Sequence, residues 1–468
     1  MKNKLISLIC AVCMLIGCVV WLVSCDDATS EAVSVVGAQI NDDGELILVY
    51  SDGSVHNLGL VVGKDGEDGK DGADGADGTD GKDGEDGKDG EDGKDGANGS
   101  SGSGSIVITG EGSTIPAASA KGLRSAVSIV CNFTRKVSSG WPNYGTRTEE
   151  YSAGGSGVIY QLDKGAGDAF IITNYHVVYD SDSLTANGIS DDISVFVYGS
   201  EKEAQAIPAT YVGGSLYYDI AVLRVDDSEI IRQSDVVEIE IANSDNVIVG
   251  GNAIAVGNAK GYGISVSVGV VSVDSEYITM AAADGVTSVT FRVMRVDTAI
   301  NSGNSGGGLY DESGKLLGIV NAKIVDDGVE NIGYAIPSNI AIAVADNIID
   351  HCYETDVECV QRALLGVSVT TSDSRAVYDV ENGRFVIEET VSVYEVTKGS
   401  LVDGVLEAGD IFVSASIGDN TVIITRQHHM IDMMINARVG DTVKMTVIRN
   451  GEEITLSVEI TADCITDY

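Results

Sequence analysis

The pattern of hydrophobic and polar positions divides the chain into five stretches. The first 25 residues are largely apolar, residues 26–62 alternate around two turn signals, and residues 63–105 carry a glycine at every third position up to residue 102. Residues 117–350 and 363–461 contain many short runs rich in valine, isoleucine and glycine. Short alternating apolar runs predict β-strands. We therefore expect a mainly β protein with two globular domains.

Residues 117–350 form the larger predicted domain. A helix-like segment opens it, and short strands then follow without the long helices that a parallel α/β sheet needs between its strands. This pattern suits two packed six-stranded barrels. A helical stretch then leads to the second domain, residues 363–461.

A glycine-rich turn, Gly303-Asn304-Ser305-Gly306-Gly307, is a candidate catalytic segment. Glycines on both sides let a serine sit on a tight turn with its hydroxyl exposed and the neighbouring N–H groups converging on one point. We expect Ser305 to be a nucleophile, with the backbone N–H groups of Gly303, Asn304 and Ser305 as its oxyanion hole. Because such turns are also common on surfaces, the prediction depends on suitable partners elsewhere.

The apolar run from Ala169 to Val178 is interrupted at Asn174-Tyr175-His176, which predicts a buried strand with His176 at its end. Histidine is the usual general base at neutral pH. Of the five histidines in the chain, four lie in less suitable places: His56, His351, His428 and His429. We expect His176 to be the base for Ser305.

Asp219 stands at the start of another apolar run, which ends at Val225. Burying its carboxylate costs several kcal/mol unless a partner compensates. The N–H of a histidine ring is a suitable partner, and a turn residue before an edge strand is the alternative interpretation.

His176, Asp219 and Ser305 follow the chain order of the chymotrypsin-like proteases. At these residues the chain resembles the HtrA (DegP-like) serine proteases. The resemblance covers about residues 119–350, in the motifs GGSGVIY, ITNYHVV, YDIAVLRV, AIAVGNAKGYGISVSVGVVS, INSGNSGGGL, GKLLGIVNAKI and NIGYAIPSN. It implies a double β-barrel with the three residues in the cleft, and cleavage after small or medium aliphatic residues.

The second domain resembles a PDZ domain of the HtrA type. Leu364-Leu365-Gly366-Val367 matches the carboxylate-binding loop, which implies capture of peptide C-termini by β-augmentation. Met430 and Met434 either line that groove or pack in the core. His428 and His429 could form a metal site, but adjacent helical residues point apart, so they are interpreted as exposed polar residues. No spacing of metal ligands is found, and neither a metal nor a cofactor is predicted.

The first 25 residues combine a basic start with a long apolar run, which indicates an export signal. Leu22-Val23-Ser24-Cys25 resembles a bacterial lipobox and implies lipidation of Cys25 after cleavage. The alternative is an uncleaved transmembrane anchor. Either way, we expect the protein at the cell membrane, on its extracytoplasmic face.

Between this signal and the first barrel lie a predicted β-hairpin segment, 26–62, and the Gly-x-y stretch, 63–105. A strict Gly-x-y period is typical of a collagen-like triple helix, which implies a homotrimer, although these triplets contain no proline. The alternative is a solvated acidic linker. The formal net charge of −42 argues against nucleic acid as a partner.

Four cysteines lie beyond the signal segment, too few for a disulfide framework in an exported chain of this size: Cys131, Cys352, Cys359 and Cys464. Cys352 and Cys359 can pair only if the segment between them bends, because on one continuous helix they lie too far apart.

The predicted function is an ATP-independent serine endopeptidase that acts on unfolded or damaged extracytoplasmic proteins. Its PDZ domain would bind substrate tails or regulatory C-termini. Two alternatives remain open, a surface scaffold or holdase that binds chains without cutting them, and a collagen-like adhesin.

Overall fold

The structure, a computed structural model of the chain, describes residues 35–40, 45–50, 54–60, 114–138, 146–198, 203–321, 332–353, 360–380 and 384–467. The chain divides into two compact units, residues 1–96 and 97–468. The predicted signal segment, the lipidation of Cys25, the Gly-x-y spacer and the pairing of Cys352 with Cys359 all involve residues outside the described ranges. Within those ranges, no helix has the length and hydropathy needed to cross a membrane.

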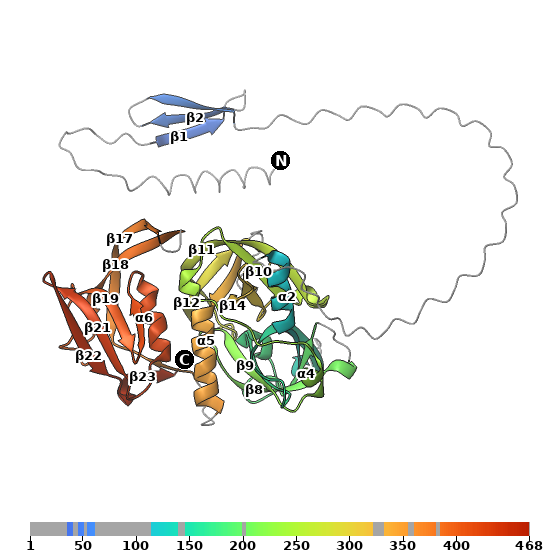
Figure 1. Cartoon of the computed structure of the whole chain (residues 1–468). Coiled ribbons are helices and arrows are strands. Elements are labelled where there is room, and N and C mark those ends of the chain that lie inside the picture. Colours follow the sequence, from blue (N-terminus) through green and yellow to red (C-terminus); the bar gives the residue numbers. More distant parts are fainter. Residues whose placement is uncertain are drawn as a thin grey trace, which may run out of the picture. The chain divides into compact units, whose positions relative to one another are not determined.

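The first unit contains one small antiparallel sheet (Figure 1). Its strands are β1 (Val35–Ile40), β2 (Glu45–Tyr50) and β3 (Val55–Leu60), paired in the order β1-β2-β3. A sheet of this size buries little surface, so its own core contributes little stability.

The second unit begins with two closed barrels of six strands each, as predicted. The first barrel, in the order β4-β5-β6-β9-β8-β7, comprises β4 (Ala126–Ser138), β5 (Thr146–Asp163), β6 (Asp168–Thr173), β7 (Asp192–Val197), β8 (Ile207–Ser215) and β9 (Ile220–Val225). The second, in the order β10-β11-β12-β15-β14-β13, comprises β10 (Asn252–Gly257), β11 (Ser265–Ala281), β12 (Ser288–Val296), β13 (Gly308–Tyr310), β14 (Leu316–Val320) and β15 (Gly333–Pro337).

Helices join the barrels into one body. Helix α2 (Ile115–Ser125) begins at Thr114, whose hydroxyl caps Ala117 N–H, and its Gly122 lies close against Tyr310 of the second barrel. Helix α5 (Ser338–Asn347), extended by the π-helical turn η5 (Ile348–Tyr353), contacts β9 of the first barrel and β14 of the second. The short helices are α3 (Tyr175–Val178) and α4 (Glu229–Gln233). One hydrophobic cluster therefore runs through both barrels and α5.

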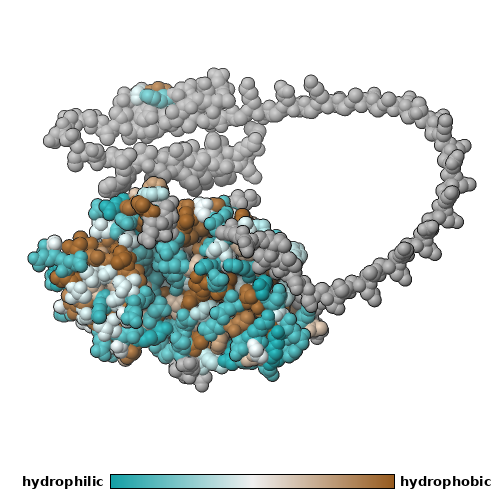
Figure 2. Space-filling model, viewed as in Figure 1, coloured by the Kyte–Doolittle hydropathy of each residue, from teal (hydrophilic) through white to brown (hydrophobic). Residues whose placement is uncertain are grey.

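The C-terminal domain is an α+β fold in which a six-stranded sheet packs with helix α6 and a two-stranded sheet joins its ends, so the predicted fold class is confirmed (Figure 1). Its strands run in the order β17-β18-β19-β21-β22, and β20 pairs with β19. They are β17 (Val367–Asp379), β18 (Arg384–Val396), β19 (Ile411–Ile417), β20 (Asn420–Ile423), β21 (Thr442–Arg449) and β22 (Glu452–Glu459). Helix α6 (Gln427–Met433) continues into the 3-10 turn η6 (Met434–Asn436), and β16 (Gln361–Ala363) pairs with β23 (Ile465–Asp467). The visible surface is mostly hydrophilic, with small apolar groups between the polar ones (Figure 2).

Candidate active site

His176 and Asp219 meet at one edge of the first barrel. His176 lies in the one-turn helix α3, directly after β6, and Asp219 lies in the turn before β9. The His176 backbone N–H donates to Asp219 Oδ1 at 2.9 Å, and ring Nδ1 lies 2.7 Å from Oδ2. These two contacts fix the imidazole with its Nε2 as the nitrogen available for proton transfer.

Asn321 is a third donor to this carboxylate, and no sequence motif singled it out. It follows β14 in the second barrel, is fully buried, and donates from Nδ2 to Asp219 Oδ2 at 2.8 Å. The buried carboxylate of Asp219, which is 7% exposed, thus accepts three N–H hydrogen bonds that offset the cost of its burial. The only signal in the sequence was a single asparagine at the end of the apolar run LLGIV.

The turn that carries Ser305 depends on its glycines. Gly303 has φ +95° and Gly306 has φ +81°, values that favour glycine. A Cβ on Gly303 would lie 2.3 Å from the Asn258 carbonyl oxygen, and one on Gly306 would lie 2.2 Å from the Ser156 carbonyl oxygen. The turn therefore packs tightly between the two barrels.

The same packing brings Ser305 against the part of the first barrel that carries His176. Ser156 N–H donates to the Ser305 carbonyl at 2.8 Å, and a Cβ on Gly306 would lie 3.0 Å from Asn174 N, two residues before His176. Between the two described side chains no hydrogen bond joins Ser305 Oγ to His176. Such bonds are often long in the absence of substrate and shorten when substrate binds.

Backbone hydrogen bonds decide which N–H groups of the turn can bind an oxyanion. The Ser302 carbonyl accepts from Lys260 N–H at 2.7 Å, and because a trans peptide directs its C=O and N–H oppositely, the Gly303 N–H points away from that contact. Asn304 N–H donates to the Asn301 carbonyl at 3.0 Å, so its prediction as an oxyanion donor is wrong. Within the described ranges, the N–H groups of Gly303 and Ser305 have no protein acceptor.

In the C-terminal domain, the predicted loop lines a cavity of about 480 Å³. Leu364, Leu365, Gly366 and Val367 all contribute to its wall. The Leu364 N–H is already bound to the Cys464 carbonyl at 2.8 Å, so the N–H groups of Leu365 and Gly366 are the better candidates for a peptide carboxylate.

Helix α6 and the turn η6 that follows it also line this cavity. Met430 and Met434 line the cavity, and they are only 5% and 4% exposed. The pair therefore both lines the groove and packs in the core. The expectation that His428 is an exposed polar residue is wrong, since it is 5% exposed. Helix α6 buries it against the protease domain.

The fold and the His176, Asp219 and Ser305 arrangement define a trypsin-like serine endopeptidase followed by a PDZ domain. Models of three known families match the chain: a trypsin-like peptidase domain at residues 155–319, a PDZ domain at 363–460 and a collagen triple helix repeat at 60–107. The chain belongs to the HtrA family of serine proteases.

Two relatives illustrate this membership. The chain is 32% identical over 321 residues to serine protease Do-like HtrA of Lactococcus lactis subsp. cremoris (strain MG1363), covering 66% of this chain and 71% of that protein. It is 31% identical over 316 residues to serine protease Do-like HtrA of Bacillus subtilis (strain 168), covering 66% and 64%. Among solved structures, an HtrA-type protease, AlgW with decapeptide, matches with 24% identity and a TM-score of 0.45, covering 74% of this chain and 97% of that one.

Proposed function

We propose that this protease is tethered to the cell membrane and cleaves unfolded or damaged extracytoplasmic polypeptides through an acyl-enzyme on Ser305. The observation that carries the chemistry is the His176–Asp219 pair, held at 2.7 Å, beside a turn in which two N–H donors have no acceptor among the described residues. Nothing in this mechanism calls for ATP or a metal.

Each group then has one task. Ser305 Oγ attacks the scissile carbonyl carbon while His176 takes its proton, and the imidazolium then protonates the leaving amine. Water, deprotonated by His176, hydrolyses the resulting ester and restores Ser305. The N–H groups of Gly303 and Ser305 stabilise the oxyanion in both steps, each worth roughly 10²–10³ in kcat.

Cleavage after small or medium aliphatic residues is supported by the apolar wall beside the turn. Ile300 precedes the turn, and a Cβ on Gly333 would lie 2.6 Å from its Cδ1, so the two residues are in close contact. Apolar pockets discriminate mainly by size, so an apolar side chain beside the turn fits a preference for small or medium aliphatic residues.

The tether is proposed from the N-terminal segments. The lipobox-like sequence at Cys25 would anchor the chain, and a transmembrane anchor is the alternative. The collagen-repeat match at 60–107 supports a homotrimer through a triple helix, which would also hold the protease away from the bilayer. A peptide C-terminus bound at Leu365 and Gly366 would deliver substrate or regulate activity.

The test is fluorophosphonate labelling combined with casein turnover. Labelling of Ser305 and loss of turnover by more than about 10³-fold in Ser305→Ala are expected, because the nucleophile is removed. Unchanged casein turnover in that variant would rule out Ser305 as the nucleophile. Casein held in solution by a wild-type chain that never cleaves it would instead favour the holdase alternative.

A further inference from the structure

Three possible metal ligands converge where the PDZ domain contacts the protease domain. Asp245 lies in the 3-10 turn η2 (Ser244–Asn246), and His428 and His429 lie on helix α6. One ligand atom from each lies within 4.8 Å of the others, and His428 Nε2 is 3.5 Å from Asp245 Oδ1. None of the three belongs to the catalytic cleft or the peptide groove.

Both imidazoles are oriented by contacts at Nδ1. His429 Nδ1 lies 2.9 Å from the Ile423 carbonyl oxygen and 3.3 Å from the Thr425 N–H, which requires the other tautomer, so we place its proton on the shorter contact, toward Ile423. His428 Nδ1 lies 3.3 Å from Ser275 Oγ. A metal-binding histidine commonly donates its second ring N–H to a carbonyl or hydroxyl in this way, which leaves Nε2 for the ion. The two Nε2 atoms are therefore the expected ligands.

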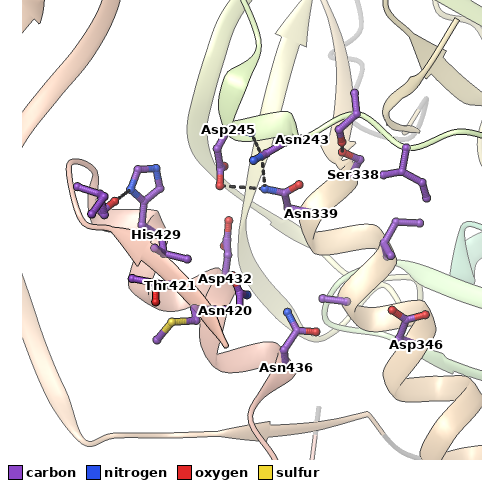
Figure 3. Close-up of a pocket in the computed structure, with 17 residues that line it drawn as sticks. Asn243, Asp245, Ser338, Asn339, Asp346, Asn420, Thr421, His429, Asp432 and Asn436 are labelled. Atoms are coloured by element: carbon purple, nitrogen blue, oxygen red, sulfur yellow. Dashed lines mark hydrogen bonds between the residues drawn. The ribbon is translucent and has the colours of Figure 1, made fainter. Parts of the chain in front are cut away.

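A cavity of about 630 Å³ adjoins this cluster and gives room for an ion and its water. Asp245, His429 and Asp432 all line it, and the carboxylates of Asp245 and Asp432 face one another beside the His429 ring (Figure 3). Asp432 is 8% exposed, and its Oδ2 has no hydrogen bond. A buried oxygen without a hydrogen bond in a polar cavity is a site where an ion or its water can bind.

Arg292 is the cation that contacts both carboxylates of the site, and Arg362 adds a second positive charge that acts on Asp432. Arg292 Nη1 lies 3.0 Å from Asp245 Oδ1 and Arg292 Nη2 lies 3.2 Å from Asp432 Oδ2, so one guanidinium faces two carboxylates. Among the described residues, Arg292 Nε and Nη2 have no hydrogen-bond acceptor. Asn339 Nδ2 donates to the other oxygen, Asp245 Oδ2, at 2.9 Å, so an ion at Oδ1 would compete with Arg292 for that oxygen alone.

We propose that Asp245, His428 and His429 bind a divalent transition-metal ion of the zinc type and thereby join the PDZ helix α6 to the protease domain. Two imidazoles and one carboxylate suit zinc, whereas calcium and magnesium prefer sites made of oxygen ligands alone. Three protein ligands leave a fourth position, which water from the cavity fills.

The experiment titrates zinc into the full chain, stripped of metal with a chelator, by calorimetry. One site per chain is expected, with a dissociation constant that rises by more than about 100-fold in His428→Ala, His429→Ala and Asp245→Asn, because each removes a ligand. His56→Ala, which removes an exposed histidine of the other unit, is the matched control and keeps the site. The acidic spacer is identical in all variants, so its binding cancels in the comparison.

Cobalt gives a second measurement that does not depend on activity. Cobalt(II) bound to nitrogen and oxygen ligands is expected to show visible d–d bands without a thiolate charge-transfer band, and Asp245→Asn, which preserves the size of the side chain, is expected to lose them. A thiolate band would place the ion on cysteines and overturn the proposal. A zinc site that is absent in the wild type, or of equal affinity in all four variants, would overturn it as well.

Discussion

The catalytic cleft and the junction between the PDZ and protease domains solve the problem of buried polar groups differently. In the proposed catalytic site, the Asp219 carboxylate accepts from three N–H donors, and the N–H groups of Gly303 and Ser305 have no acceptor among the described residues. At the junction, Arg292 and Asp432 are buried, and each has side-chain atoms without a hydrogen bond.

The difference shows which region has a fixed geometry and which has an energy that its surroundings can change. Three donors hold the Asp219 carboxylate in one geometry, which a catalytic site needs before the substrate arrives, although Asn174 Oδ1 and Asn304 Oδ1 nearby have no hydrogen-bond partner among the described residues. A buried charge with incomplete partners has an energy that a proton, an ion or a domain movement can change. We therefore expect substitutions in the cleft to change rate, and substitutions at the junction to change stability and its dependence on pH.

Asp219→Asn is expected to have the largest effect. An amide in place of the carboxylate favours the wrong imidazole tautomer and removes the stabilisation of the imidazolium, so kcat/KM should fall by roughly 10⁴-fold. Casein or peptide hydrolysis measures it. Asp432→Asn, the equivalent change at the junction, should keep kcat/KM within about twofold, and a comparable loss there would end the distinction between the two regions.

Gly303→Ala is expected to lower kcat by roughly 10²–10³-fold, the size that loss of one oxyanion donor has elsewhere. The new Cβ would lie 2.3 Å from the Asn258 carbonyl oxygen, so the peptide that presents the Gly303 N–H must move. Gly250→Ala is the matched control, because Gly250 also has a positive φ (+84°) but nothing within 4 Å of its Cβ position. Equal losses in both variants would point to general strain rather than to the oxyanion hole.

Asn321→Ala tests the support of the triad from the second barrel. Removing one hydrogen bond to a buried carboxylate costs about 1.5–3 kcal/mol, so a fall in kcat of about 10–100-fold with little change in KM is expected. Steady-state kinetics separate the two constants. An effect confined to KM would show that Asn321 contacts substrate and does not position Asp219.

The two barrels could be predicted from the short alternating strands, and the PDZ domain from the resemblance of local motifs to a known family. The catalytic roles of His176, Asp219 and Ser305 stay predictions, which also depend on local motifs. His176 stands at the end of an apolar run, and Ser305 lies between glycines. Asn321 could not be found in this way. Its role depends on the second barrel meeting the first, and a single asparagine after a strand carries no local signal.

The contacts at the junction could not be predicted from the sequence for the same physical reason. Arg292, Asp245 and Asp432 come from three separate segments, and only tertiary packing brings them together. His428 appeared exposed because adjacent histidines on a helix were expected to point apart, but the helix itself is buried against a second domain. The Asn304 N–H failed as an oxyanion donor since its bond to Asn301 is a detail of turn geometry.

The smallest expected effect, and the one specific to the junction, is on stability. Burial is the main cause that raises the pKa of Asp432 to about 7, with Asp245 adding to it and Arg292 and Arg362 opposing it. A carboxyl with a raised pKa in the folded state contributes stability at low pH, and that stability is lost as pH rises from about 4 towards 7. The side chain that Asp432→Asn introduces carries no such charge. The free energy of unfolding of Asp432→Asn relative to the wild type should therefore rise by about 2 kcal/mol from pH 5 to pH 8.

Urea unfolding of the full chain at pH 5 and pH 8, followed by fluorescence, measures this gain. Asp419→Asn, at an exposed aspartate of the same domain, should track the wild type at both pH values, since its charge is in water in both states. If Asp432→Asn is instead less stable than the wild type at pH 8, pairing of Asp432 with Arg292 outweighs the burial cost. The burial of Asp432 would then be compensated by its partner, as that of Asp219 is by its hydrogen bonds, and the contrast between the two regions would be lost.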